Sequence, residues 1–295
     1  MADVPAMALN NGVEIPQIGF GVFRIPGDET VSAVLSAIEA GYRGIDTASL
    51  YGNETAVGTA VARCGLPREQ LFITTKLWND DQGYESTFRA FEASLRRLGL
   101  DYVDLYLIHW PVPAKSAYLE TWKAFEEIYA NGRARAIGVS NFQPWHLQPL
   151  LDQHKIVPAV NQVELHPRFQ QEQMRAFDRA HGIVTEAWSP LAQGDILADP
   201  MITALSRRYG KTPAQIVLRW HIELGNVVIP KSVTPSRIKE NINIFDFSLV
   251  ADDLAALRTL DRGARTGPDP DGGERPAGFS SAGGRWVPEG TTEPG

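Results

Sequence analysis

Leu71-Phe-Ile-Thr-Thr-Lys76 is a short strand-like run that ends on a lysine. Val103-Asp-Leu-Tyr-Leu-Ile-His109 repeats this pattern and ends on a histidine, while Gly44-Ile-Asp46 closes on an aspartate with Tyr51 soon after it. A strand that is buried on both faces should continue with apolar residues or stop at a turn residue. Runs that end on titratable groups instead indicate several parallel strands that deliver polar side chains to one rim.

Strand-like and helix-like segments alternate over most of the chain. Strands are expected at residues 18–19, 44–46, 71–76, 103–109, 136–140, 159–164, 183–187 and 227–229. Helical patterns lie between them, for example at 29–40, 87–98, 119–129 and 171–180. Two helices are expected between the seventh and eighth strands, with Thr212-Pro213 as the cap and first residue of the second one. Eight strands, each followed by helical sequence, predict an α/β fold, the (β/α)₈ TIM barrel.

The two ends of the chain differ from the expected barrel. Asn11-Gly12 between apolar flanks predicts a two-residue hairpin turn, and such a hairpin could plug the bottom of the barrel. From Ala264 onward the chain is rich in Gly and Pro and poor in apolar residues. We therefore expect a barrel domain over residues 1–263 and an irregular tail or substrate-side lid over 264–295.

The composition fits one large barrel. The chain has 295 residues, 43% of them hydrophobic, and a net charge of −7. That charge argues against a general nucleic-acid or membrane-surface binder. No apolar run is long enough to span a bilayer, and no signal-peptide pattern is visible, so a cytoplasmic protein is expected. We also expect it to be a monomer. Cys64 is the only cysteine, which excludes an intrachain disulfide. No set of His, Asp and Glu has metal-ligand spacing, so no metal is expected.

Asp46, Tyr51, Lys76 and His109 have the chemistry of an assisted proton donor. A phenol has an unperturbed pKa of about 10 and needs help to act near neutral pH. A nearby Lys76 would lower the pKa of Tyr51, and Asp46 would hold that lysine in its charged form. His109 could hydrogen-bond a substrate carbonyl. Taken singly, each residue also has a structural explanation, such as a rim aromatic, a buried ion pair or a satisfied histidine.

Segments along nearly the whole chain, up to about residue 262, carry a family resemblance. They are Gly41-Tyr-Arg-Gly-Ile-Asp-Thr-Ala48, Tyr51-Gly-Asn-Glu54, Thr74-Thr-Lys-Leu-Trp78, Leu107-Ile-His-Trp-Pro111, Gly138-Val-Ser-Asn-Phe142, Asn161-Gln-Val-Glu-Leu-His-Pro167 and Ile229-Pro-Lys-Ser232. In this order they resemble the aldo-keto reductases, nearest to the bacterial 2,5-diketo-D-gluconate reductase-type members. The resemblance implies a barrel enzyme that reduces aldehydes or ketones to alcohols with NADPH. Its catalytic residues would be Tyr51, Lys76, Asp46 and His109.

The expected cofactor site lies on the barrel loops. No Gly-x-Gly-x-x-Gly motif follows a strand, so a Rossmann-type site is not indicated. By the resemblance, the nicotinamide carboxamide is hydrogen-bonded by Ser140, Asn141 and Gln162, and the nicotinamide ring stacks on Trp188. The loop Ser189-Pro-Leu-Ala-Gln-Gly194 is suited to wrap a pyrophosphate through backbone N–H groups. Its candidate contacts are Ser189, Leu191 and Gln193.

A second part of the cofactor site follows the eighth strand. Two cations, two hydroxyls and the start of a helix there make an anion site, formed by Lys231, Ser232, Val233, Thr234 and Arg237. The resemblance assigns it to the adenosine 2′-phosphate, which favours NADP(H) over NAD. It also places the adenine against Glu240 and Asn241, although a solvated helix face explains Glu240 equally well.

The substrate pocket is less clear from the sequence. The candidates are Val22, Trp78, His109, Trp110 and Trp286, and the partner would be a small-molecule carbonyl. Many members of the family carry an aromatic residue near Val22, and none is expected there in this chain. Two alternatives stay open. One is an NADP-binding regulatory barrel with slow turnover. The other is an aldolase with a Schiff base on Lys76, which would need that lysine uncharged.

Overall fold

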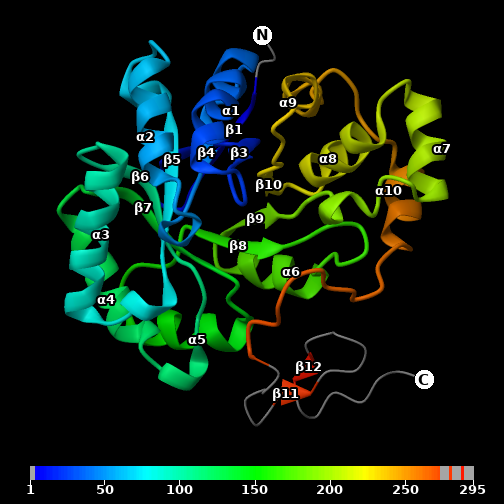
Figure 1. Ribbon diagram of the computed structural model, residues 1–295. Helices are drawn as coiled ribbons and strands as arrows, with labels where there is room; N and C mark the ends of the chain where they lie inside the picture. The colour runs from blue at the N-terminus through cyan, green and yellow to red at the C-terminus, as the bar shows by residue number, and fades with distance from the viewer. Residues whose placement is uncertain (1–3, 273–278, 281–286, 289–295) are drawn as a thin grey trace.

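A closed barrel of eight parallel strands forms the centre of the molecule in the computed structural model, which describes residues 4–272, 279–280 and 287–288 (Figure 1). In barrel order the strands are β3 (Gly19–Gly21), β4 (Gly44–Asp46), β5 (Phe72–Leu77), β6 (Val103–Ile108), β7 (Ala134–Ser140), β8 (Val160–Glu164), β9 (Val184–Trp188) and β10 (Val227–Val228). A parallel bridge between Ile18 and Val228 closes the ring. The expected (β/α)₈ barrel is confirmed, with its first strand slightly later than predicted.

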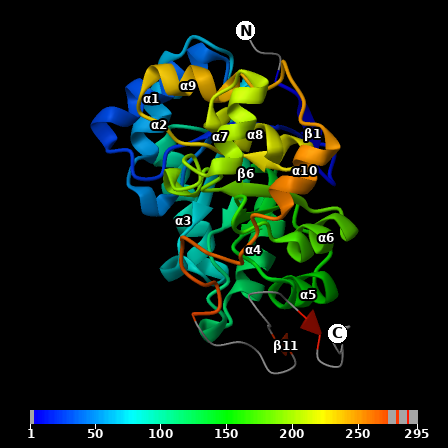
Figure 2. The same ribbon diagram turned by 90° about the vertical axis from the view of Figure 1, so that its right-hand side faces the viewer.

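Helices surround the barrel. They are α1 (Gly27–Ala40), α2 (Glu54–Arg63), α3 (Tyr84–Leu98), α4 (Tyr118–Ala130), α5 (Pro144–Gln153), α6 (Glu172–Ala180), α7 (Pro200–Tyr209), α8 (Pro213–Glu223), α9 (Pro235–Ile242) and α10 (Ala251–Arg258). Figure 2 shows α9 beside α1, so the outer ring closes where the barrel closes. None of the described helices is long and apolar enough to cross a membrane.

The start of α8 shows how local sequence sets these helices. The Thr212 hydroxyl accepts a hydrogen bond from the backbone N–H of Gln215, and the Gln215 side chain accepts one from the backbone N–H of Thr212. This reciprocal cap satisfies two donors that a helix start leaves unpaired. Pro213 at the first position needs no N–H there. The predicted cap at Thr212-Pro213 is thus present.

The N-terminal hairpin, β1 (Ala6–Ala8) with β2 (Glu14–Pro16), covers the amino end of the barrel. Leu9 and Ile15 are buried in one apolar cluster with barrel residues such as Phe72 and Leu105. The expected plug is therefore present, but the turn is longer than predicted. The backbone N–H of Leu9 donates to the oxygen of Val13 at 2.8 Å, which leaves three residues, 10–12, in the loop.

The barrel interior changes from apolar to polar along its axis. Residues two apart on a strand face the same side. Along β5, Phe72 therefore lies at the amino end of the barrel, Thr74 in the middle and Lys76 toward the carboxyl end. Strand pairing brings Asp46 level with Thr74, and Glu164 level with Trp188. The hairpin covers the apolar amino end of the barrel. The polar residues lie toward the opposite, carboxyl end.

Replacing Gly58 by Ala should destabilise the fold. A Cβ at Gly58 in α2 would lie 2.0 Å from the backbone oxygen of Leu98 in α3. Such overpacking costs about 1–3 kcal/mol, more than the roughly 0.5–1 kcal/mol that Ala gains over Gly in a helix. We expect thermal unfolding of G58A to show a Tm several degrees lower. The control is G27A, because a Cβ at Gly27 meets no atom within 4 Å. Equal Tm values for the two variants would contradict the prediction.

Candidate active site

Three of the four expected catalytic residues meet in direct contact at the carboxyl end of the barrel. Asp46 ends β4, Lys76 lies near the end of β5, and Tyr51 ends a 3₁₀ turn, Ser49–Tyr51, after β4. The Lys76 Nζ donates to Asp46 Oδ1 at 2.7 Å and to the Thr47 backbone oxygen at 2.9 Å. It also lies 3.3 Å from the Tyr51 hydroxyl. The lysine thus links the carboxylate to the phenol.

Lys76 is charged despite complete burial. Its exposed fraction is 0%, and burial alone would lower the pKa of its ammonium group. The charge of Asp46 and the hydrogen bonds with Asp46 and Tyr51 outweigh this effect and raise the pKa. A charged lysine cannot attack a carbonyl carbon, so this arrangement disfavours a Schiff-base enzyme.

Tyr51 carries its proton at neutral pH. Burial raises the pKa of its phenol above the ordinary value, Lys76 lowers it, and Asp46 raises it further. Lys76 therefore acts in the expected direction, but burial outweighs it. The phenol is held in its protonated form beside a cation that would stabilise a phenolate.

His109 directly follows β6, and its ring centroid lies 5.7 Å from that of Tyr51 and 5.2 Å from that of Trp78. Burial and the charge of Lys76 hold the pKa of His109 well below its usual range, so the imidazole is neutral. Its Nδ1 has no hydrogen-bond partner within the described part of the chain. A neutral ring in this place can act as a hydrogen-bond donor toward a carbonyl oxygen.

The residues expected at the nicotinamide lie beside the catalytic residues and are joined by hydrogen bonds. Asn141 donates from Nδ2 to the backbone oxygen of His109 at 3.0 Å and accepts from Trp188 Nε1 at 2.8 Å. The Ser140 hydroxyl donates to the backbone oxygen of Gln162 at 2.8 Å. The amides and the indole are therefore fixed in position by their neighbours.

Backbone strain is concentrated on the loops at this end. Within the described residues, the non-glycine residues with positive φ are Arg24, Val112, Ser116, Asn141, Gln171, Ser189, Ala192 and Gln193. Every one of them lies in a loop that follows a barrel strand. Such conformations cost about 1–3 kcal/mol each and cluster at functional sites. Three of them lie in the loop after β9 that is expected to wrap the pyrophosphate.

The proposed anion site lies at the start of α9. Lys231, Thr234 and Arg237 are exposed, and neither cation forms an ion pair with a carboxylate of the described residues. The backbone N–H of Thr234 donates to the Ser232 hydroxyl at 3.1 Å, and Val233 beside them is exposed. Unpaired cations at a helix start fit a phosphate group.

The two residues expected at the adenine, Glu240 and Asn241, already have contacts within the protein. The Thr212 hydroxyl donates to Glu240 Oε1 at 2.7 Å, so this carboxylate holds α9 against α8. Asn241 is buried in the same helix. Only part of Glu240 therefore remains available to a ligand.

Val22, one of the residues expected to line the substrate pocket, is buried in this structure. Its exposed fraction is 0%, and it packs in the apolar core. The next residue, Phe23, is 49% exposed, and its ring centroid lies 4.9 Å from that of Tyr51. The aromatic residue that was not expected near this position is therefore present. Trp78 and Trp110 are half-buried, whereas Trp286 lies outside the described residues.

Glu164, which was not predicted, fixes the first part of the C-terminal segment. It ends β8 and is buried. The hydroxyl of Thr266 donates to Oε1 at 2.6 Å, and the backbone N–H of Gly267 donates to Oε2 at 3.1 Å. Gly267 passes so close to Trp188 that a Cβ would lie 2.4 Å from its Cη2. Figure 1 shows this segment running from α10 past α6 toward α5.

Comparison with known proteins shows the family of this chain. The chain belongs to the aldo/keto reductase family, whose family model matches residues 17–262. It is 50% identical over 273 residues to the methylglyoxal reductase DkgA of Escherichia coli (strain K12), covering 92% of this chain and 98% of that protein. It is 51% identical over 264 residues to the glyoxal reductase of Bacillus subtilis (strain 168), covering 89% of this chain and 95% of that protein.

A solved structure of a Gox0644 mutant in complex with NADPH is similar throughout. It superposes with a TM-score of 0.89 at 46% sequence identity and covers 93% of this chain and 100% of that one. The family inferred from the sequence segments is confirmed. The protein is an oxidoreductase of the aldo-keto reductase type.

Replacing Glu164 by Gln should release the segment around Thr266. Burial raises the pKa of Glu164, but hydrogen bonds from His166, Thr266 and Gly267 outweigh burial and hold this pKa below its usual range. The charged anchor is therefore present above the ordinary carboxyl pKa and is lost as pH falls through the lowered value. Hydrogen bonds to a charged group contribute about 1.5–3 kcal/mol. We expect roughly ten- to a hundredfold lower hydrogen-exchange protection at Gly267 in the variant.

The matched control is Glu39→Gln on the exposed face of α1, which should leave this protection unchanged. Equal protection at Gly267 in wild type and Glu164→Gln would show that other contacts hold the segment.

Proposed function

We propose that this protein reduces small aldehydes and ketones with NADPH and that Tyr51 protonates the carbonyl oxygen. The observation that carries the proposal is the 3.3 Å contact between the Tyr51 hydroxyl and the charged Lys76, with a neutral His109 beside them. A phenol that keeps its proton until a substrate needs it, next to a cation that stabilises its conjugate base, has the properties of a general acid.

Each residue of the site has one task in this mechanism. The carbonyl oxygen is positioned by a hydrogen bond from the neutral His109. Tyr51 transfers its hydroxyl proton to that oxygen as negative charge develops on it. The Lys76 ammonium then stabilises the phenolate, and Asp46 keeps the lysine charged and in place. NADPH, when bound, supplies the hydride that reduces the carbonyl carbon.

The residues present fit this cofactor. Ser140, Asn141 and Gln162 would hold the carboxamide, Trp188 would face the nicotinamide ring, and the strained loop 189–194 would hold the pyrophosphate. Lys231 and Arg237 would bind the 2′-phosphate. Their lack of ion-pair partners among the described residues is the supporting observation, because unpaired cations leave their charge for a ligand.

The substrate class that fits best is a short aldehyde or ketone with a second carbonyl beside the first. Support comes from the names of two relatives, a methylglyoxal reductase and a glyoxal reductase. Phe23 and Trp78 have rings against Tyr51 and His109, and Gly267 passes close to Trp188. A mouth bordered in this way favours small substrates, and we propose that the segment from Ala264 acts as a substrate-side lid.

The rival function is an NADP-binding regulatory barrel. Steady-state NADPH oxidation with methylglyoxal, glyoxal, aromatic aldehydes and β-keto esters separates the two. Turnover that depends on the carbonyl supports the reductase, with the highest kcat/KM on the small dicarbonyls. Tight NADPH binding without turnover supports the regulator and overturns the proposal.

Replacing Tyr51 by Phe should abolish most carbonyl reduction. The ring and its packing remain, and only the proton donor is lost. General acid groups contribute about 10²–10⁴-fold, so kcat should fall by that factor while the Kd for NADPH stays nearly unchanged. Tyr84→Phe is the control, because the exposed Tyr84 hydroxyl bonds Glu127 and none of the catalytic residues. A Tyr51→Phe enzyme within threefold of the wild-type kcat would refute the role of Tyr51.

Arg237 should carry much of a preference for NADPH over NADH. One charge-assisted hydrogen bond to a phosphate contributes about 1.5–3 kcal/mol, or roughly ten- to a hundredfold in affinity. Arg237→Ala should therefore weaken NADPH binding by that factor and leave NADH binding nearly unchanged, as fluorescence titration can measure. Lys239→Ala, exposed on the same helix, is the control. Equal losses for both cofactors in Arg237→Ala would place this arginine outside the phosphate site.

A further inference from the structure

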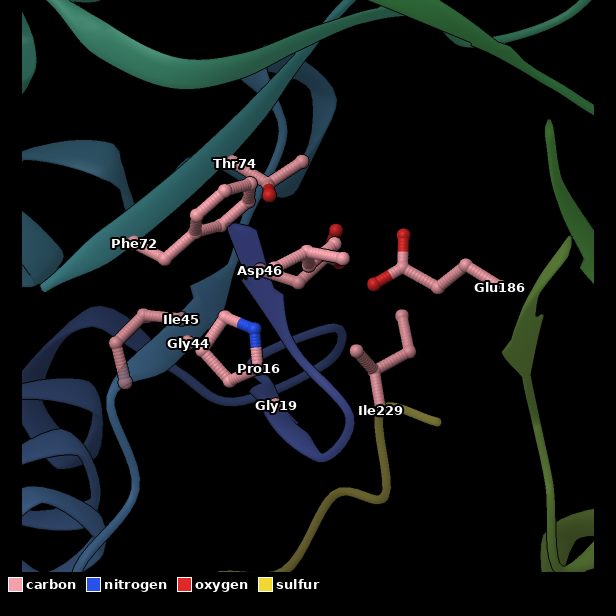
Figure 3. Close-up of a pocket in the computed structure, with 10 residues that line it drawn as sticks. Pro16, Gly19, Gly44, Ile45, Asp46, Phe72, Thr74, Glu186 and Ile229 are labelled. Carbon is pink, nitrogen blue, oxygen red and sulfur yellow. The ribbon is translucent and has the colours of Figure 1, made fainter. Parts of the chain in front are cut away.

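A second carboxylate, Glu186, lies inside the barrel below the catalytic group. It occupies the middle of β9 and is 3% exposed. Figure 3 shows its carboxylate pointing across a small cavity toward Asp46. The cavity has a volume of about 10 Å³ and is lined by both carboxylates together with Thr74, Phe72 and Ile229. That volume is close to the space one water molecule needs.

One amide group joins the two carboxylates. Gln162 Nε2 donates to Asp46 Oδ2 at 2.8 Å and to Glu186 Oε2 at 2.8 Å. An amide nitrogen has two hydrogens and accepts nothing, so both hydrogens are used and the orientation of Gln162 is fixed. The side chain expected to hold the nicotinamide carboxamide is therefore oriented from below by Glu186 and Asp46.

The charges in this interior do not balance if both carboxylates are ionised. Lys76 is the cation that faces them, and it forms its ion pair with Asp46. Glu186 forms no ion pair with any cation of the described residues. Two carboxylates that share one neighbourhood resist ionising together. Glu186, which has no ion-pair partner among the described residues, is therefore the carboxyl group whose ionisation is opposed.

We propose that Glu186 is a positioning residue of this reductase, which orients Gln162 and, by gaining or losing a proton, changes the electrostatic field at Tyr51. The inference rests on the proposed role of Tyr51 as the proton donor. The groups that face Glu186 are Asp46 on β4, Lys76 on β5 and the neutral Gln162 on β8.

The direction of the effect follows from the charges. Burial first, and then the charge of Asp46, raises the pKa of Glu186 to about 7. Glu186 therefore gains its negative charge as pH rises through neutrality, and this charge raises the pKa of Tyr51. The phenol thus keeps its proton to higher pH than it would with Asp46 alone. Carbonyl reduction, which needs the phenol, should persist into the alkaline range.

The test is Glu186→Gln, which keeps the side-chain volume and the oxygen that accepts from Gln162. The alkaline limb of kcat/KM for methylglyoxal reduction should shift to lower pH by about one unit, the size expected for one charge in a buried interior. The Tyr51 phenolate, followed by its ultraviolet absorbance against Tyr51→Phe, should appear at lower pH by a similar amount. A phenolate titration that superposes on the wild type would overturn the inference.

Two further variants separate charge from structure. Glu186→Asp keeps a titrating carboxyl group, so its alkaline limb should stay near the wild-type position even where kcat falls. A shift as large as that of Glu186→Gln would contradict a role for charge. Asp178→Asn removes another buried carboxylate, whose pKa burial raises to about 8 but which bonds Thr185 and Asn161 instead of the site. It should leave the alkaline limb and the phenolate titration unchanged, and a shift equal to that of Glu186→Gln would overturn the inference.

The absorbance measurement distinguishes this inference from the proposed function. A shifted phenolate titration in a protein without carbonyl turnover would retain the coupling of Glu186 to Tyr51 and refute the reductase assignment. Carbonyl turnover with an unshifted phenolate titration would support the reductase assignment and refute the coupling of Glu186 to Tyr51.

Discussion

The buried pairing of Lys76 with Asp46 is the constraint around which this end of the barrel is built. A lysine side chain without solvent contact loses several kcal/mol of hydration, and only a complete set of partners offsets that loss. The ammonium group has three hydrogens and finds three oxygens, from Asp46, Thr47 and Tyr51. The third of these hydrogen bonds holds the Tyr51 phenol beside the lysine. The need to satisfy a buried cation and the need to activate a proton donor are therefore met by one geometry.

This pairing also explains the opposite behaviour of the two other titratable groups. The positive charge of Lys76 helps to keep His109 neutral and limits the rise in the pKa of Tyr51. The neutral ring can then donate a hydrogen bond to a carbonyl oxygen without competing as an acid. Gln162 connects the same Asp46 to Glu186 on the far side of the interior. Charge near the phenol is thus set by side chains from three strands, two of which the neutral Gln162 joins from a fourth.

Much of this rim could be predicted because parallel strands in a barrel end at the same face. A titratable residue at the end of each strand is then enough to bring Asp46, Lys76 and His109 together. Strand ends give no guide to the position of Val22, because β3 ends at Gly21 and strand alternation no longer holds beyond it. Glu186 escaped notice because it lies within a strand rather than at its end, although a carboxylate in a buried strand was itself a signal. Glu164 could not be identified, because its partners lie far along the chain in a segment without periodicity.

The strained loops have a consequence for how such a protein changes under selection. Eight non-glycine residues in the described chain hold a left-handed backbone, and all of them surround the mouth of the barrel. Selection for thermal resistance alone would relax first those of these positions that lie outside the core, since glycine or asparagine there relieves strain without disturbing packing. Within the described residues, the hairpin end of the barrel has no non-glycine residue with such a strained backbone. Laboratory evolution toward heat tolerance should therefore change the loops proposed to bind the cofactor while the barrel itself stays nearly unchanged, and an engineer would need to select for binding in the same round.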